Sequence, residues 1–135
     1  MSAPDAPATH VFGLDVHYED TDMGGIVYHA NYLRFIERAR SAWVRTLGID
    51  QNALREAGTV FVVRHVECDF LATARFEDAL CVDTRVLDRS GARLRLEQVV
   101  RRGDQPLFTA RVTVVAMGLS GRPTRLPAEI RALPR

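Results

Sequence analysis

One long segment with helical periodicity constrains what this chain can fold into more than any other feature. From about residue 28 to residue 47, apolar side chains recur every three or four positions, as they do on the buried face of a helix. They are Tyr32, Phe35, Ile36, Ala39, Ala42, Trp43 and Leu47. A helix of about twenty residues is roughly 30 Å long, as long as a small domain is wide. Gly48 follows where a helix commonly ends, and the next residues predict a short second helix between Asp50 and Gly58.

Everything after Gly58 is predicted to be β-strand. Apolar, β-branched or alternating residues occupy four runs, 59–66, 80–87, 92–101 and 107–117, and a fifth run precedes the helix at 10–17. Short polar turns at 89–91 and 102–104 join neighbouring runs, so those strands must be antiparallel. Because the long helix has no second helix to cover it, we expect the sheet to wrap around it in an α+β fold. The outer face of the last run is partly apolar at Val115 and Met117, which favours a dimer or tetramer.

The composition of the 135 residues is that of an ordinary globular protein with one domain. The net charge is only +1, which argues against a nucleic-acid-binding protein. Residues 1–9 are rich in Pro and Ala and predict a flexible arm before a single domain at 10–135, and they lack the features of a signal peptide. No run is long and apolar enough for a membrane span. Cys68 and Cys81 lack the spacing of a paired motif, and these features together predict a cytoplasmic protein.

Acidic residues gather in the turn before the long helix, within residues 19–22, and two glycines follow them. One interpretation is structural, with an aspartate that caps the helix or stabilises the turn. A second is a metal site, although none of the usual ligand spacings is present. Its candidate ligands would be His17, Asp20, Asp22 and His29. A third interpretation is a catalytic carboxylate beside the N-terminus of the helix.

The third interpretation has a specific chemical logic. Unpaired N–H groups at the start of a helix stabilise negative charge, so they can polarise a carbonyl and hold its oxyanion. A carboxylate opposite that carbonyl can attack it or activate water. Because a carboxylate is a weak base, the leaving group must depart easily, and a thiolate does so. The chain has no Gly-x-Ser-x-Gly motif, and the sequence therefore favours thioester hydrolysis.

The same segment resembles the signature of a known enzyme family. Residues 18–32 read YEDTDMGGIVYHANY and residues 35–40 read FIERAR. This pattern is similar to that of the YbgC-like acyl-CoA thioesterases, which belong with the 4-hydroxybenzoyl-CoA thioesterases in the hotdog-fold superfamily. The resemblance continues through residues 60–64, 74–75 and 126–127, so it covers nearly the whole chain past the arm. Thr73 stands where the family more usually has proline, and we expect it to change the local backbone and not the chemistry.

The resemblance implies a fold, an activity and three catalytic positions. The long helix would lie inside a curved five-stranded antiparallel sheet, in a homodimer or homotetramer. Asp22 would be the nucleophile or general base, the backbone N–H of His29 would form the oxyanion hole, and Gly25 would line the approach. The enzyme would hydrolyse short-chain or aromatic acyl-CoA thioesters to free acid and CoA, with no metal and no cofactor.

Further residues are candidates for substrate binding. Tyr28 lies within the signature, next to His29. Glu37 lies about two helical turns beyond His29, where it would meet the far end of an acyl group, as an acid does in the benzoyl-CoA relatives. The alternative for Glu37 is an ordinary ion pair with Arg40 on the helix surface. Arginines in or near the late turns are candidates for the phosphates of CoA: Arg89, Arg93, Arg122 and Arg125.

Two other functions remain open at this point. The chain could be a non-catalytic hotdog protein that binds an acyl thioester or serves as a scaffold, but a binder does not need a carboxylate that faces the carbonyl. It could also be a hotdog hydratase, for which we would expect a catalytic histidine–acid pair. The acyl preference, and the choice between CoA and acyl-carrier protein, do not follow from the sequence.

Overall fold

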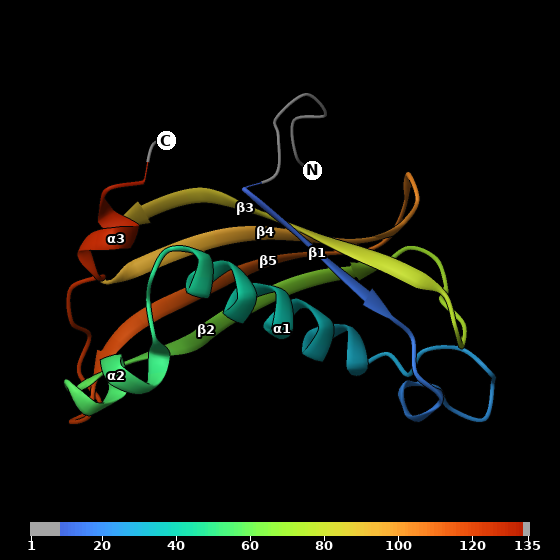
Figure 1. Cartoon of the computed structure of the whole chain (residues 1–135), viewed down its shortest axis with the longest axis horizontal. Helices are drawn as coiled ribbons and strands as arrows, with labels where there is room; N and C mark the ends of the chain where they lie inside the picture. Colours follow the sequence, from blue (N-terminus) through green and yellow to red (C-terminus); the bar gives the residue numbers. More distant parts are fainter. Residues whose placement is uncertain (1–8, 134–135) are drawn as a thin grey trace.

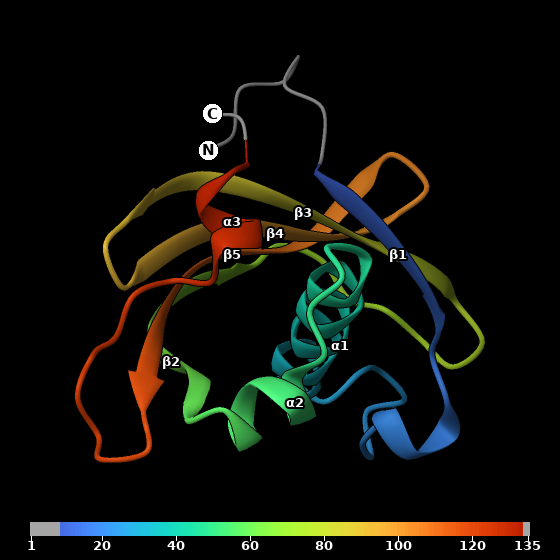
Figure 2. The same cartoon turned by 60° about the vertical axis from the view of Figure 1, so that its left-hand side comes forward.

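The computed structural model describes residues 9–133, which form a curved sheet around one long helix (Figure 1). The elements in chain order are β1 (His10–Asp15), the 3-10 turn η1 (Tyr18–Asp20), α1 (Asn31–Thr46), α2 (Gln51–Glu56), β2 (Thr59–Phe70), β3 (Ala79–Ser90), β4 (Arg93–Arg102), β5 (Gln105–Gly118) and α3 (Ala128–Arg131). The five strands lie in the order β1-β3-β4-β5-β2, and each is antiparallel to its neighbours. The sheet arches over α1 (Figure 2). The expected α+β hotdog fold is confirmed.

The ends of the helices differ from the prediction at one place. Helix α1 begins at Asn31 and not near residue 28, because the N–H of Tyr28 donates to the Asp20 carbonyl at 2.9 Å and keeps the preceding residues in a loop. The predicted stop at Gly48 is confirmed, with a φ of +82° that favours glycine. The predicted cap of α2 at Asp50 is also confirmed.

Every predicted strand is present; β2, β3 and β5 are longer than expected, β4 has the expected length and β1 is shorter. The largest extension at one end is in β2, which runs on to Phe70, past the predicted end at residue 66. Helix α3 was not predicted, because its four residues are too few to show a helical period. Ile130 anchors it in the core, where its side chain is fully buried.

The hydrophobic core lies between α1 and the concave face of the sheet. Of the seven residues that the periodicity predicted, Ala42 and Leu47 are only half-buried. The other five are buried in α1, and Val44 is buried in addition: Tyr32, Phe35, Ile36, Ala39, Trp43 and Val44. One face of β5 is buried against them, as expected from its alternation. Gln98 is a fully buried polar residue in this core, and its amide nitrogen donates to the Ile36 carbonyl at 2.9 Å and to Thr84 Oγ1 at 3.0 Å. These two bonds tie the middle of α1 to the sheet.

The convex face of the sheet is more polar than predicted. Arg85 pairs with Glu97 at 2.7 Å, and Arg101 pairs with Asp83 at 2.7 Å. Val115, one of the residues on which the expectation of an apolar outer face rested, is buried within the chain itself. This face therefore offers less exposed apolar surface to a second copy than expected, and the oligomer stays a prediction.

Exposed apolar side chains gather instead on β2, the edge strand at one side of the sheet. Its residues Val63, Val66 and Phe70 share the register of buried β5 residues and so point to the concave face. Their exposed fractions are nevertheless 44%, 36% and 51%. Strand β2 thus presents an apolar face that residues 9–133 cover only in part.

Two further predictions concern the N-terminal arm and the absence of a membrane span. The predicted arm at 1–9 falls outside the described residues except for Thr9, whose hydroxyl accepts a hydrogen bond from the Val86 N–H at 3.3 Å. No helix within residues 9–133 has the length and apolar character needed to cross a membrane.

Candidate active site

Asp22 lies at the tip of a tight turn between η1 and α1. Its N–H donates to the Ile26 carbonyl at 3.0 Å, and its own carbonyl accepts the Gly25 N–H at 2.9 Å. Its side-chain Oδ1 accepts the Gly24 N–H at 2.9 Å. Gly25 has a φ of +75°, which explains why glycine stands there. The turn therefore holds an exposed carboxylate in a defined direction, with its second oxygen, Oδ2, not used by the described residues.

The neighbouring acid, Asp20, has a structural role. Its side chain is buried, and Oδ2 accepts the His17 N–H at 2.8 Å. Its carbonyl accepts both the Tyr28 N–H and the Asn31 amide, each at 2.9 Å. The structural interpretation of the acidic turn is thus correct for Asp20. Its hydrogen bonds join the hairpin that carries Asp22 to the start of α1. Within residues 9–133, no three His, Cys, Asp or Glu side chains come together in an arrangement that could hold a metal ion.

The start of α1 is open. Ala30 occupies the N-cap position and has no side chain that could accept a hydrogen bond from the first turn. The His29 and Ala30 N–H groups have no acceptor among the described residues. The hydrogen bond from the Tyr28 N–H to the Asp20 carbonyl joins this segment to the hairpin whose turn carries Asp22. The predicted signature residues Asp22, Gly25, Tyr28 and His29 therefore lie in one hydrogen-bonded loop directly before α1.

An aromatic cluster borders the open helix start. The His29 ring lies 4.5 Å from the Tyr28 ring and 6.1 Å, edge to face, from the Phe70 ring. Phe70 also packs on Phe108 at 5.1 Å, and the Tyr32 ring stacks on Phe108 at 5.0 Å. Burial raises the pKa of the Tyr32 hydroxyl. Sequence analysis missed Phe70, which continuing the alternation of β2 past residue 66 would have found.

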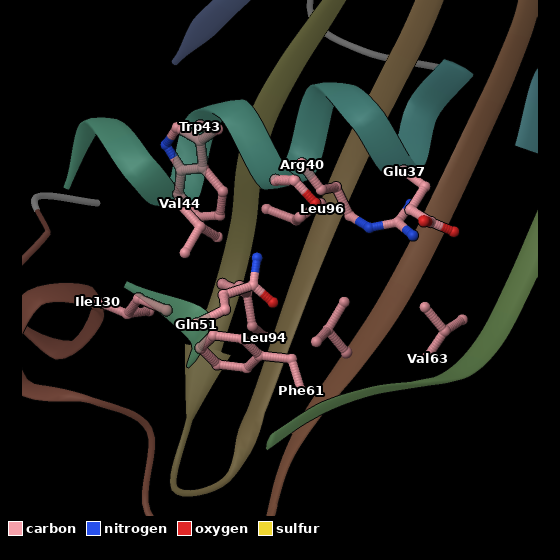
Figure 3. A pocket seen from close by; sticks show the side chains of 12 residues that line it. Glu37, Arg40, Trp43, Val44, Gln51, Phe61, Val63, Leu94, Leu96 and Ile130 are labelled. Atoms are coloured by element: carbon pink, nitrogen blue, oxygen red, sulfur yellow. The ribbon is translucent and has the colours of Figure 1, made fainter. Parts of the chain in front are cut away.

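A cavity of about 260 Å³ opens along the same helix, between α1 and the sheet. Glu37, Arg40 and Ser41 lie at its polar side, and Trp43, Phe61 and Leu94 belong to its apolar lining. Figure 3 shows Glu37 and Arg40 next to each other at one end, with Trp43 and Val44 toward the other.

Arg40 is held by the core and not by Glu37. Its Nη1 donates to Gln98 Oε1 at 3.0 Å, and burial lowers the pKa of its guanidinium. Glu37 is exposed and forms no ion pair among the described residues. Glu37 and Arg40 thus form no salt bridge, although the Glu37 charge acts to raise the pKa of the Arg40 guanidinium against the effect of burial, and Glu37 borders a cavity.

The arginines predicted to bind the phosphates of CoA lie away from the Asp22 turn. Arg89 and Arg93 flank the β3–β4 turn, next to α3 and at the opposite end of the molecule from the Asp22 turn (Figure 1). Arg89 donates to the carbonyls of Arg131 and Leu133, so it holds the C-terminal segment. Within one chain the structure does not bring Arg89 or Arg93 together with Asp22. Arg122 and Arg125 are exposed in the segment that follows β5.

Comparisons with known proteins agree with this geometry. Residues 16–133 match the family model of the thioesterase-like superfamily. The acyl-CoA thioesterase YbgC of Haemophilus influenzae is 41% identical over 123 residues, which cover 90% of each chain. The acyl-CoA thioester hydrolase YbgC of Escherichia coli O157:H7 is 39% identical over 119 residues, which cover 87% of this chain and 89% of that one.

Solved structures lead to the same family. The crystal structure of a probable thioesterase from Bartonella henselae superposes with a TM-score of 0.84 at 39% identity, over 87% of this chain and 98% of that one. The architecture, the signature and the relatives all agree. The chain therefore belongs to the hotdog-fold thioesterases of the thioesterase-like superfamily, a family of thioester hydrolases.

Proposed function

We propose that this chain is an acyl-CoA thioesterase in which Asp22 and the His29 N–H act on opposite sides of the thioester carbonyl. One observation carries the proposal. The exposed Asp22 carboxylate lies in the hairpin directly before α1, and the His29 and Ala30 N–H groups that follow it have no acceptor within residues 9–133. The substrate class follows from the relatives, which are named acyl-CoA thioesterases.

The arrangement supports two routes to the same products. In the first, an Asp22 oxygen bonds to the carbonyl carbon, the C–S bond breaks, CoA leaves as a thiolate, and water hydrolyses the resulting anhydride. In the second, Asp22 takes a proton from a water molecule that attacks the carbon directly. In both routes the His29 N–H stabilises the oxyanion, aided by the dipole of α1. Gly25 has no side chain that would block the approach.

The cavity beside α1 is our proposed site for the acyl group. Glu37 lies eight residues after His29, which corresponds to roughly 12 Å along the helix axis. A carboxylate at that distance favours an acyl or aryl group with a hydroxyl there, since a plain alkyl chain would leave the carboxylate buried without a partner. We therefore keep short-chain and aromatic acyl-CoAs as the proposed substrates, with Tyr28 and Glu37 as binding residues.

The open face of β2 supports the proposed dimer or tetramer. Val63, Val66 and Phe70 are exposed on an edge strand, and a second copy of the chain would cover them and extend the sheet. A second copy would also be needed to bring Arg93 near a bound CoA. Light scattering at micromolar concentration should report at least twice the 15.1 kDa mass of one chain. A monomer under these conditions would contradict the proposal.

Asp22→Asn is the test of the proposed chemistry. It keeps the shape of the side chain but removes both nucleophile and base, so turnover should fall at least ~10²-fold with folding intact. Release of free thiol from a panel of acyl-CoAs, read with a thiol-reactive dye, measures the rate. Glu19→Gln is the matched control, because Glu19 lies in the same turn with a side chain 82% exposed. Unchanged turnover in Asp22→Asn would refute the catalytic role of Asp22. Absence of hydrolysis in the unchanged protein would instead favour the non-catalytic binding protein.

A further inference from the structure

Arg102, at the end of β4, lies outside the site described above but contacts the loop behind it. Its Nη1 donates to Asp78 Oδ2 at 2.8 Å and to the Thr73 carbonyl at 3.3 Å. Its Nη2 donates to Gln105 Oε1 at 3.0 Å, which holds the guanidinium from the following strand. One side chain therefore joins both ends of the loop 73–78 to the β4–β5 hairpin.

Asp78 also forms hydrogen bonds within the loop 73–78. Its Oδ2 accepts the Arg75 N–H at 2.9 Å, and its own N–H donates to the Arg75 carbonyl at 3.0 Å. The hydrogen bond from the Arg75 backbone and the adjacent Arg102 guanidinium hold the pKa of the Asp78 carboxyl below its usual value. The carboxylate thus stays charged, and paired with Arg102, throughout the neutral range.

The loop in turn supports the turn that carries Asp22. The Ala74 carbonyl accepts the Val27 N–H at 2.8 Å, and Arg75 forms a β-bridge with Ile26. Ile26 is the residue whose carbonyl accepts the Asp22 N–H at 3.0 Å. Ala74 itself is fully buried, so this loop has little room to shift. A continuous set of hydrogen bonds therefore leads from Arg102 to the backbone of Asp22.

We propose that Arg102 and Asp78 are positioning residues that fix the Asp22 turn against the start of α1 by holding the loop between them. The consequence for catalysis rests on the proposed function, while the mechanical coupling does not. Neither residue faces the thioester. Their effect is on geometry, and small errors in the placement of reacting groups cost large factors in rate.

The chain offers a matched control in the adjacent residue of the same strand. Arg101 forms a two-bonded ion pair with Asp83, at 2.7 and 3.2 Å, and also donates to the Gly103 carbonyl. The exposed fractions of the side chains are 29% and 26% for this pair, against 38% and 26% for Arg102 and Asp78. Arg101 makes no contact with the loop 73–78 among the described residues. Arg101→Gln therefore removes a similar ion pair without touching the support of Asp22.

Amide hydrogen exchange tests the coupling without reference to activity. In Arg102→Gln, the Val27 amide should exchange about tenfold faster. Its acceptor is the Ala74 carbonyl, and the variant loses the charged hydrogen bonds that hold the loop around Ala74. In Arg101→Gln, the Val27 amide should exchange as in the unchanged protein. If Arg102→Gln does not fold, exchange of the Val27 amide is measured in Asp78→Asn, which removes the charge of the other partner of the ion pair. Equal acceleration in both arginine variants, or in neither, would overturn the proposal.

Kinetics test the consequence for the site. With an acyl-CoA that the unchanged protein hydrolyses, Arg102→Gln should lower kcat about tenfold with little change in KM. Arg102→Lys, which keeps the charge beside Asp78 but cannot reach three oxygens, should give an intermediate kcat. Faster exchange at Val27 with an unchanged kcat would overturn the positioning role. Absence of hydrolysis in the unchanged protein would instead refute the proposed function, and the exchange result would still decide the coupling.

Discussion

The two longest helix-forming segments begin in opposite ways. At the start of α2, the Asp50 carboxylate accepts the N–H groups of Asn52 and Ala53 at 2.9 and 3.3 Å. At the start of α1, Ala30 offers no acceptor, and the His29 N–H has none among the described residues. Helix α2 thus begins with a side-chain cap, whereas α1 begins without one, directly after the hairpin that carries Asp22. In our proposal the His29 N–H is the donor to the substrate oxyanion.

Closing the open terminus should have the largest effect. Ala30→Asp places a carboxylate beside the N–H groups of α1, where it competes with the oxyanion and opposes its negative charge. Turnover should fall roughly 10²-fold, about the cost of losing one oxyanion donor, while stability is unchanged or slightly raised. Steady-state thioester hydrolysis and thermal unfolding measure the two effects. Ala30→Asn is the control of equal size, and equal turnover in both variants would contradict the role of charge at this terminus.

Glu37 tests how far along α1 the substrate extends from the open end. Glu37→Ala should change the ratio of kcat/KM between hydroxylated or aromatic and plain aliphatic acyl-CoAs by about 1–3 kcal/mol, the cost of one buried polar group without a partner. A panel of acyl-CoAs measures this ratio. Glu37→Gln, which keeps a hydrogen-bonding group, should shift the ratio less. If rates fall equally on all substrates, or not at all, Glu37 has no part in the choice of acyl group.

Removing the Asp50 cap of α2 should mainly lower stability, whereas closing the start of α1 should mainly lower turnover. Asp50→Ala removes the acceptor of two N–H groups, so the free energy of unfolding should fall by about 1 kcal/mol. Turnover of short acyl-CoAs per folded molecule should change little, because α2 lies at the other end of α1 from the hairpin that carries Asp22, and only its first residue, Gln51, lines the cavity (Figure 1). Denaturant unfolding and the thiol-release assay measure the two quantities. A loss of turnover at unchanged stability would remove the distinction between the two helix starts.

Local sequence patterns predicted most of the secondary structure and the central part of the site. The period of α1, the alternation of β4 and β5, and the turn at Gly48 all depend on residues close in the chain, and all three predictions were confirmed. The end of β2 and the whole of α3 were missed. In β2 the alternation does continue past residue 66, through Cys68 and Phe70, but the prediction stopped where charged residues intervene, and these residues are exposed in the described chain.

Tertiary structure decided which of several side chains of the same type has a structural role and which stays exposed. The sequence by itself determined that a helix follows an acidic, glycine-containing turn, but both Asp20 and Asp22 fit either role there. The family resemblance singles out Asp22, and the folded chain gives the physical reason: Asp20 is buried and accepts the His17 and Tyr28 N–H groups, while Asp22 is exposed. Gln98 and Arg102 likewise acquire their roles from partners far away in sequence. Local patterns record which face of an element is buried, whereas the partner of a charged or polar group depends on contacts that form only when distant segments meet.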